Sequence, residues 1–157
     1  MKITLLSIGK TEENYLKQGI EIYVKRLKHY IKLEVTELPE LKNTKHLSQE
    51  VQKKKEAEML LKAILNTDFV VLLDERGIEL SSALFAQYIN KRMIASTSNL
   101  VFITGGPYGF DTLMYERAND KISLSKLTFS HQMIRLFFVE QVYRAFTILK
   151  GEPYHHP

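Results

Sequence analysis

The chain has 157 residues, of which 45% are hydrophobic, 25% are charged and none is cysteine. This length is typical of one domain, and the apolar fraction is sufficient for a core. No run of about 18 apolar residues occurs, which excludes a helical membrane span, and the lack of cysteine excludes disulfides and thiolate metal sites. We therefore expect a single domain over residues 1–157 that acts in the cytoplasm, with no signal peptide and no membrane partner.

The net charge of +4 is carried by the first part of the chain. Residues 1–66 contain 13 Lys and Arg against 9 Asp and Glu, whereas residues 67–157 contain 9 of each kind. The excess is concentrated between Lys25 and Lys32 and in Lys53-Lys54-Lys55. This distribution indicates either a surface that binds a polyanion or two solvated helix faces, and charge alone favours neither.

The first half of the chain alternates between predicted strands and helices. Residues 2–9 and 33–38 have the apolar content of short strands. Apolar residues at helical spacing predict helices over 13–31 and 47–65. The stretch 39–46 between them is the expected exposed loop.

The second half continues the alternation. Continuous apolar runs at 69–74 and 100–104 are typical of strands buried on both faces, and a shorter strand is predicted at 122–125. Ser81-Ser82 and Asp111 have the side chains of helix N-caps. The predicted helices span 82–93, 111–119 and 131–149, and Gly151 and Pro153 end the last one.

About five alternations of strand and helix predict an α/β fold with a mostly parallel sheet of five or six strands and helices on both faces. The final helix, 131–149, is apolar around nearly its whole circumference, so more than one side of it must be covered. A central position under other elements would cover it. We favour a partner subunit, because a small domain has little protein to cover an outermost helix.

Ligands of parallel α/β sheets bind at the carboxyl ends of the strands. Three loops follow such ends: Asp74–Gly77, Gly105–Gly109 and Ser125–Phe129. The glycine-rich loop matches neither the dinucleotide fingerprint nor a phosphate loop. It indicates a small ligand whose recognition does not rest on phosphates, although a plain turn explains it equally well.

The C-terminal stretch contains several side chains that could take part in binding or catalysis. Arg144, Glu152, Tyr154 and His155 are titratable groups within the last short stretch, which indicates an end that is tucked into the fold. Glu140 and Arg144 have the i, i+4 spacing of a helical salt bridge. The histidines lack the spacing of metal ligands, so we expect no metal.

Several motifs together carry a resemblance to a known family. They are Leu73-Asp74-Glu75-Arg76-Gly77, Phe102-Ile103-x-Gly105-Gly106-x-x-Gly109, Leu124-Ser125-Lys126-x-Thr128-Phe129-x-His131-Gln132, Glu140-Gln141-x-Tyr143-Arg144-Ala145-Phe146 and Gly151-Glu152-Pro153-Tyr154-His155. On these residues the chain resembles, nearly end to end, the RlmH (YbeA) family of the SPOUT superfamily. One departure is Ser130, where the family usually has proline.

The resemblance implies an S-adenosylmethionine-dependent methyltransferase that modifies N3 of a pseudouridine in 23S ribosomal RNA, at an intersubunit-bridge helix of the large subunit. It also implies a C-terminal trefoil knot that binds the cofactor, and a homodimer that completes each active site. The implied cofactor contacts are Leu73, Gly105, Leu124, Ser125, Lys126, Leu127, Thr128 and Phe129. The implied catalytic residues are Arg144, Tyr154 and His155, with Glu140 orienting Arg144. The alternatives are a non-catalytic RNA-binding dimer and an unrelated nucleotide-binding α/β protein.

Overall fold

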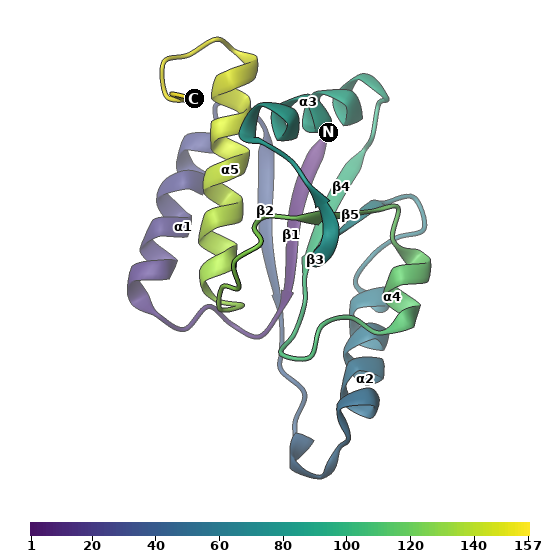
Figure 1. The fold of residues 1–157 in the computed structure, drawn as a ribbon. Coiled ribbons are helices and arrows are strands. Elements are labelled where there is room, and N and C mark those ends of the chain that lie inside the picture. The colour runs from purple at the N-terminus through teal and green to yellow at the C-terminus, as the bar shows by residue number, and fades with distance from the viewer.

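The computed structural model describes residues 1–157, and the chain alternates between strands and helices from end to end (Figure 1). None of its helices combines the length and apolar character that crossing a membrane requires. In chain order the elements are β1 (Lys2–Ile8), α1 (Asn14–Leu27), β2 (Lys32–Leu38), η1 (Thr44–His46), α2 (Gln49–Lys62), β3 (Phe69–Glu79), α3 (Ser82–Ile94), β4 (Asn99–Thr104), α4 (Thr112–Arg117), β5 (Asp120–Ser123) and α5 (Met133–Leu149).

The strands form one five-stranded sheet with the order β2-β1-β4-β3-β5. Every neighbouring pair is parallel, so each crossover runs over a face of the sheet. The inner strands read as continuous apolar runs because helices cover them on both sides. The predicted α/β fold is confirmed, with five strands and a wholly parallel sheet.

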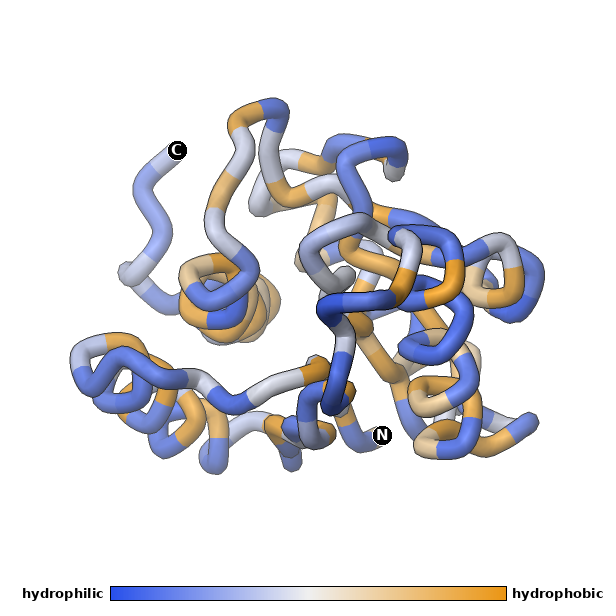
Figure 2. Tube along the Cα trace, turned by 90° about the horizontal axis from the view of Figure 1, so that it is seen from below, coloured by the Kyte–Doolittle hydropathy of each residue, from blue (hydrophilic) through white to orange (hydrophobic).

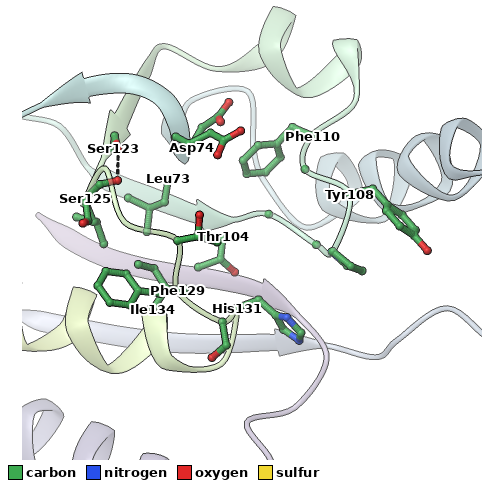
Figure 3. A pocket seen from close by; sticks show the side chains of 18 of the residues that line it. Leu73, Asp74, Thr104, Tyr108, Phe110, Ser123, Ser125, Phe129, His131 and Ile134 are labelled. Atoms are coloured by element: carbon green, nitrogen blue, oxygen red, sulfur yellow. Dashed lines mark hydrogen bonds between the residues drawn. The ribbon is translucent and has the colours of Figure 1, made fainter.

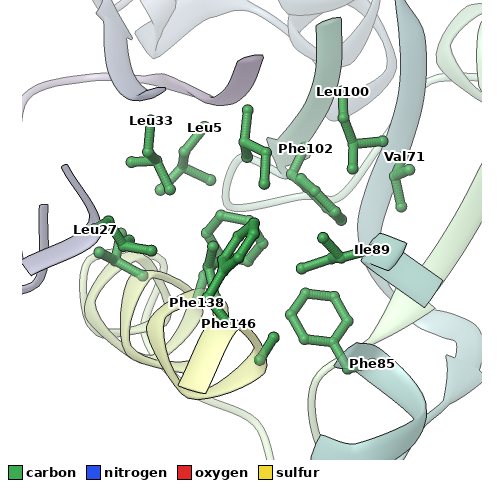
Figure 4. Close-up of a cluster of buried hydrophobic side chains, with 14 of the residues drawn as sticks. Leu5, Leu27, Leu33, Val71, Phe85, Ile89, Leu100, Phe102, Phe138 and Phe146 are labelled. Carbon is green, nitrogen blue, oxygen red and sulfur yellow. The ribbon is translucent and has the colours of Figure 1, made fainter. Parts of the chain in front are cut away.

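Helices α1, α3 and α5 cover one face of the sheet, and α5 packs against both of the others (Figure 1). Their apolar side chains meet Leu5, Phe102 and Val71 of the strands (Figure 4). The Phe138 ring of α5 is completely buried and lies 4.7 Å from the Phe102 ring, centroid to centroid. The apolar circumference of α5 is thus explained largely by its central position, and the expectation of an outermost helix is wrong.

Helices α2 and α4 cover the opposite face with a smaller core. Leu60 and Met114 from these helices pack with Leu6, Val70 and Ile103, which are the strand residues that point away from the first core. Hydrophilic segments make up most of the periphery, and the apolar segments concentrate between the layers (Figure 2). Because α1 and α2 lie on opposite faces, the two basic segments of the sequence do not form one continuous surface.

Strand β3 continues beyond its predicted end. The predicted loop Asp74–Gly77 is instead a bulged part of this strand, because the register to β5 shifts between Leu73 and Ile78, which both pair with Ile122. A Cβ at Gly77 would lie 2.5 Å from the Ile122 backbone nitrogen, so only glycine permits this close approach.

Other boundaries differ from the predictions by a few residues. Helix α1 ends at Leu27, since the amides of Tyr30 and Ile31 both turn back to the Leu27 carbonyl at 2.9 Å. Strand β5 begins and ends two residues earlier than predicted. The predicted N-caps are confirmed, because Ser81 Oγ accepts from Leu84 N at 3.2 Å and an Asp111 carboxylate oxygen accepts from Leu113 N at 2.9 Å.

Candidate active site

A cavity of about 760 Å³ opens at the carboxyl ends of β3, β4 and β5. This is within the usual size range of small-molecule sites. Its walls are the end of β3, the loop after β4, the loop after β5 and the first turn of α5 (Figure 3). All the predicted cofactor residues line it: Leu73, Gly105, Leu124, Ser125, Lys126, Leu127, Thr128 and Phe129.

The glycine-rich loop forms one wall as a tight turn. The Gly109 amide donates to the Gly106 carbonyl at 3.1 Å, and Gly109 has a φ of 81°, which a residue with a side chain rarely adopts. Phe110 then turns inward and packs edge-on against Tyr115, with ring centroids 6.1 Å apart. The three glycines of the loop line the cavity together with Tyr108 and Phe110.

The loop after β5 forms the facing wall and is held by its serines. Ser123 Oγ donates to the Ser125 carbonyl at 3.0 Å, and Ser125 Oγ accepts from Leu127 N at 2.9 Å (Figure 3). Ser130 Oγ accepts from Met133 N at 3.1 Å, so the residue that departs from the family pattern caps the start of α5. Leu127 and Phe129 remain exposed, at 73% and 38%.

The charge lining the cavity is mostly negative. Asp74 and Glu75 line it from β3, and Asp74 accepts hydrogen bonds from the Tyr115 hydroxyl and, at 3.2 Å, from Arg76 N. Burial, together with the Asp74 carboxylate, raises the pKa of Tyr115 to about 12, so this hydroxyl stays a donor. The one lysine, Lys126, lies within 3.9 Å of Glu79. Such a lining suits a neutral or cationic ligand and disfavours a phosphate.

A second cluster lies at the other end of α5 and gathers the four predicted catalytic residues. Glu140 Oε1 accepts from Arg144 NH2 at 2.5 Å and from the Tyr154 hydroxyl at 2.9 Å. Arg144 NH1 lies 3.2 Å from His155 Nδ1. Because a guanidinium only donates, this contact favours the tautomer of His155 that carries its proton on Nε2. The Arg144 guanidinium also lies over the Tyr154 ring, 4.8 Å from its centroid.

Arg144 and Tyr154 each have a raised pKa in this cluster. The hydrogen bond to Glu140 raises the pKa of Arg144, so the guanidinium stays charged. Burial raises the pKa of Tyr154, and hydrogen bonds to Tyr23 and Glu140 raise it further. Near neutral pH the site therefore contains a fixed cation and a neutral phenol, which both act as donors.

The C-terminal tail is folded against the helices, as predicted. Gly151 has a φ of 68° and ends α5, and the Glu152 amide donates to the Thr147 carbonyl at 2.9 Å. The Glu152 carboxylate accepts from the Tyr30 hydroxyl at 2.6 Å, which raises the pKa of Tyr30 to about 12. Tyr154 and His155 are consequently half-buried rather than frayed.

The two predicted residue sets do not meet within one chain. Ile134 lines the cavity at the start of α5, whereas none of the four residues of the second cluster does. At about 1.5 Å of rise per residue, Arg144 lies about 15 Å further along the helix axis. The chain thus has the cavity at the start of α5 and the cluster toward the other end of the same helix. In addition, no group of three or more His, Cys, Asp or Glu side chains is arranged to hold a metal ion.

Sequence reasoning gave no functional role to three residues that lie beside the second cluster. Tyr23 and Tyr143 pack beside Tyr154, and the Arg26 guanidinium lies over both of the first two rings. Helical periodicity assigned both tyrosines to the core, and Arg26 was counted only as net charge. The sequence gives no indication that the side chains of α1 contact Tyr143, because α1 and α5 are far apart in the sequence.

Not all of the predicted basic residues are available to a polyanion. Lys32 pairs with Glu34 at 3.1 Å, and Lys53 pairs with Glu50 at 3.1 Å with its side chain only 19% exposed. Lys25, Arg26 and Lys28 have no carboxylate within 4.0 Å. These basic side chains without a carboxylate partner are therefore gathered at the C-terminal end of α1, the helix that also contains Tyr23.

Comparison with known proteins identifies the family to which the chain is similar. A family model described as "Predicted SPOUT methyltransferase" matches residues 1–155. Proteins named "Ribosomal RNA large subunit methyltransferase H" are 58% identical in Christiangramia forsetii, 57% in Phocaeicola vulgatus and 54% in Parabacteroides distasonis. Each of these alignments runs over 156 residues and covers 99% of both chains.

Proposed function

The chain belongs to the SPOUT methyltransferase family, as its motifs predicted, and from this premise we propose that it methylates N3 of a pseudouridine in 23S ribosomal RNA with S-adenosylmethionine as donor. The relatives' shared name, at 50–58% identity, supports a large-subunit ribosomal RNA substrate. One observation carries the proposal. A cavity whose lining disfavours phosphate lies apart from a cluster that contains the charged Arg144 guanidinium and the Tyr154 phenol. A ribosomal RNA substrate also makes the cytoplasm the proposed location.

The cavity fits S-adenosylmethionine by its chemistry. This cofactor has an adenine, a ribose and a sulfonium cation, and it supplies a methyl group that is already activated for transfer. The loops at Leu73, Gly105 and 124–129 would hold it by backbone groups and apolar contacts, without a phosphate-binding lysine. The carboxylates of Asp74 and Glu75 favour the cation electrostatically. A threaded, knotted arrangement of these loops remains part of the proposal.

The second cluster fits the acceptor base. Loss of the N3 proton places negative charge on the ring carbonyls beside it, and Arg144 is the charged donor that would stabilise it. The Tyr154 hydroxyl and His155 Nε2–H would bind the base or relay its proton. Glu140 is a positioning residue here, because its 2.5 Å contact fixes the guanidinium. A flexible RNA loop allows such a base to leave its stack at low cost.

A homodimer would bring the two sites together. Phe129 and Phe137 are each 38% exposed, and their ring centroids lie 4.8 Å apart. Both rings line a second hollow of about 290 Å³, together with Leu80, Phe85 and Ile134. Contiguous apolar surface of this kind marks an interface. We propose that two copies, each a single domain, pack here so that the tail of one faces the cavity of the other.

The decisive experiment for the activity is mass spectrometry of 23S RNA from a strain that lacks the protein. We expect one methyl group to be absent from one pseudouridine and to return when the purified protein and S-adenosylmethionine are added to the ribosomes. Unchanged methylation in that strain would refute the proposed function.

The tail provides a second test. Deleting Tyr154–Pro157 should abolish methyl transfer and leave cofactor binding nearly intact, because no residue of the deleted segment lines the cavity. Cofactor affinity is measured by calorimetry and transfer by single-turnover kinetics on the same preparation. Wild-type transfer by the truncated protein would show that the tail is only structural.

A further inference from the structure

A line of tyrosine rings with a guanidinium group at each end extends beyond the cluster around Arg144. The Arg26 guanidinium lies 5.3 Å from the Tyr23 ring centroid and 5.5 Å from that of Tyr143. The Tyr143 ring stands edge-on to Tyr154, at 4.8 Å between centroids, and Arg144 lies over the Tyr154 ring at 4.8 Å. Three separate parts of the chain, α1, α5 and the C-terminal tail, build this line.

The surface at Arg26 is free for a ligand. Arg26 is exposed, while Tyr23 and Tyr143 beneath it are half-buried. Neither Arg26 nor its neighbours Lys25 and Lys28 has a carboxylate within 4.0 Å. The rings thus support one side of the guanidinium, and the exposure of Arg26 leaves its other side accessible, with two more exposed and unpaired cations nearby in the sequence.

This arrangement has the chemistry of a contact to single-stranded RNA. Unstacked bases pack on aromatic rings and on the planes of arginine guanidinium groups, while neighbouring lysines neutralise phosphates. An apolar partner fits less well, because the surface is cationic. An acidic protein partner would match the charge but would leave the planar, ring-supported guanidinium without a group to stack on it. The position next to Tyr154 places any such nucleotide beside the proposed acceptor base.

We propose that Arg26, supported by Tyr23 and Tyr143, binds an unpaired nucleotide that flanks the methylated one in the substrate RNA. The nucleotide's base stacks on the open face of the guanidinium, and its phosphates lie toward Lys25 and Lys28. The inference rests on the proposed function and adds to it a subsite that selects unstacked RNA around the target.

The test is single-turnover methylation, with saturating S-adenosylmethionine, on ribosomes purified from a strain that lacks the protein. Arg26→Ala should raise the ribosome concentration for half-maximal rate about ten-fold or more, the usual effect of losing one stacked base. The maximal rate should stay within about two-fold, and the salt slope should decrease by about one. Arg26→Lys should retain the salt slope but not the full affinity, because a lysine has no planar face.

Lys17→Ala is the matched control, since it removes one unpaired positive charge from the same helix, α1, away from the rings. We expect it to change the half-maximal concentration less than two-fold. Thermal unfolding of each variant, with Arg26→Gln as a second substitution that keeps the side-chain stem, establishes that the fold is retained.

The outcomes separate this inference from the proposed function. Equal effects of Arg26→Ala and Lys17→Ala would show a non-specific charge effect and overturn the subsite. If Arg26→Ala lowers the melting temperature but leaves the half-maximal ribosome concentration unchanged, Arg26 serves only to hold α1 against α5. That result would also overturn the proposed subsite. If the wild-type protein transfers no methyl group, the proposed function itself fails, and the inference fails with it.

Discussion

Replacing Gly105 with alanine tests the cavity as a cofactor site without disturbing the fold. An added Cβ would lie 3.4 Å from Phe110 Cε2 and 3.6 Å from Gly109 Cα, which are ordinary van der Waals contacts. We therefore expect the melting temperature of the unliganded protein to change little. The same Cβ stands on the cavity wall, where it keeps a ligand from approaching the backbone closely.

The expected magnitude follows from the linkage between binding and unfolding. At a concentration 100 times its Kd, S-adenosylmethionine stabilises the protein by about 2.7 kcal/mol. For a chain of this length that raises the melting temperature by roughly 5–11 °C. A ten-fold weaker Kd in Gly105→Ala removes about 1.4 kcal/mol, and with it about half of the rise.

The assay is a thermal unfolding scan with and without ligand at one fixed protein concentration. Gly19→Ala is the control, because its Cβ would lie 2.9 Å from Leu136 Cδ1, in the contact between α1 and α5 and away from the cavity. Its unliganded melting temperature changes, but the ligand-induced rise should equal that of the wild type. A full ligand-induced rise in Gly105→Ala would refute the assignment of the cavity.

Four further substitutions test the bulge, a buried carboxyl and the proposed interface. Gly77→Ala should cost about 1–3 kcal/mol or more in urea unfolding, because its Cβ meets the Ile122 backbone at 2.5 Å; wild-type stability would contradict the bulge. Burial raises the pKa of Glu56, so the folded protein holds that proton more tightly than the unfolded chain does. Stability should then fall as the pH rises above the ordinary glutamate pKa, and Glu56→Gln should flatten this dependence in denaturation at pH 4 and pH 7; parallel curves would contradict it. Phe137→Asp should give a folded monomer by sedimentation, whereas Phe138→Asp should unfold the protein, since Phe138 is completely buried; a Phe137→Asp dimer would argue against the proposed interface.

Local patterns were sufficient to predict most of the fold. The Ser81 and Asp111 caps and the apolar runs of β3 and β4 depend on neighbouring residues, and all were located correctly. The bulge at Gly77 depends instead on pairing with β5, which lies more than forty residues away in the sequence. The periodicity of one segment contains no information on such a pairing, so the sequence predicts an end of the strand at Asp74.

The site was predictable in its parts but not in their arrangement. Two of the three predicted loops, Gly105–Gly109 and Ser125–Phe129, do follow strand ends and line the cavity, whereas Asp74–Gly77 belongs to β3. The residues around Arg144 were identified from their motif. That the two groups lie at opposite ends of α5 required the packing of the helix between α1 and α3. The apolar circumference of α5 was consistent with either a central helix or a dimer, and the central position accounts for most of it.

The central claim is that one protomer supplies the cavity and its partner supplies the cluster around Arg144. It is tested most directly by a heterodimer in which one subunit carries Gly105→Leu and the other Arg144→Ala. The two subunits are co-expressed with different tags and purified through both.

Each variant alone should form an inactive homodimer. In the heterodimer, one of the two shared sites combines an intact cavity with an intact cluster from the partner. The account therefore predicts about half of the wild-type rate of methyl transfer to ribosomes. If each site lay within one chain, every site in the heterodimer would be damaged, and a rate no higher than that of the two homodimers would contradict the claim.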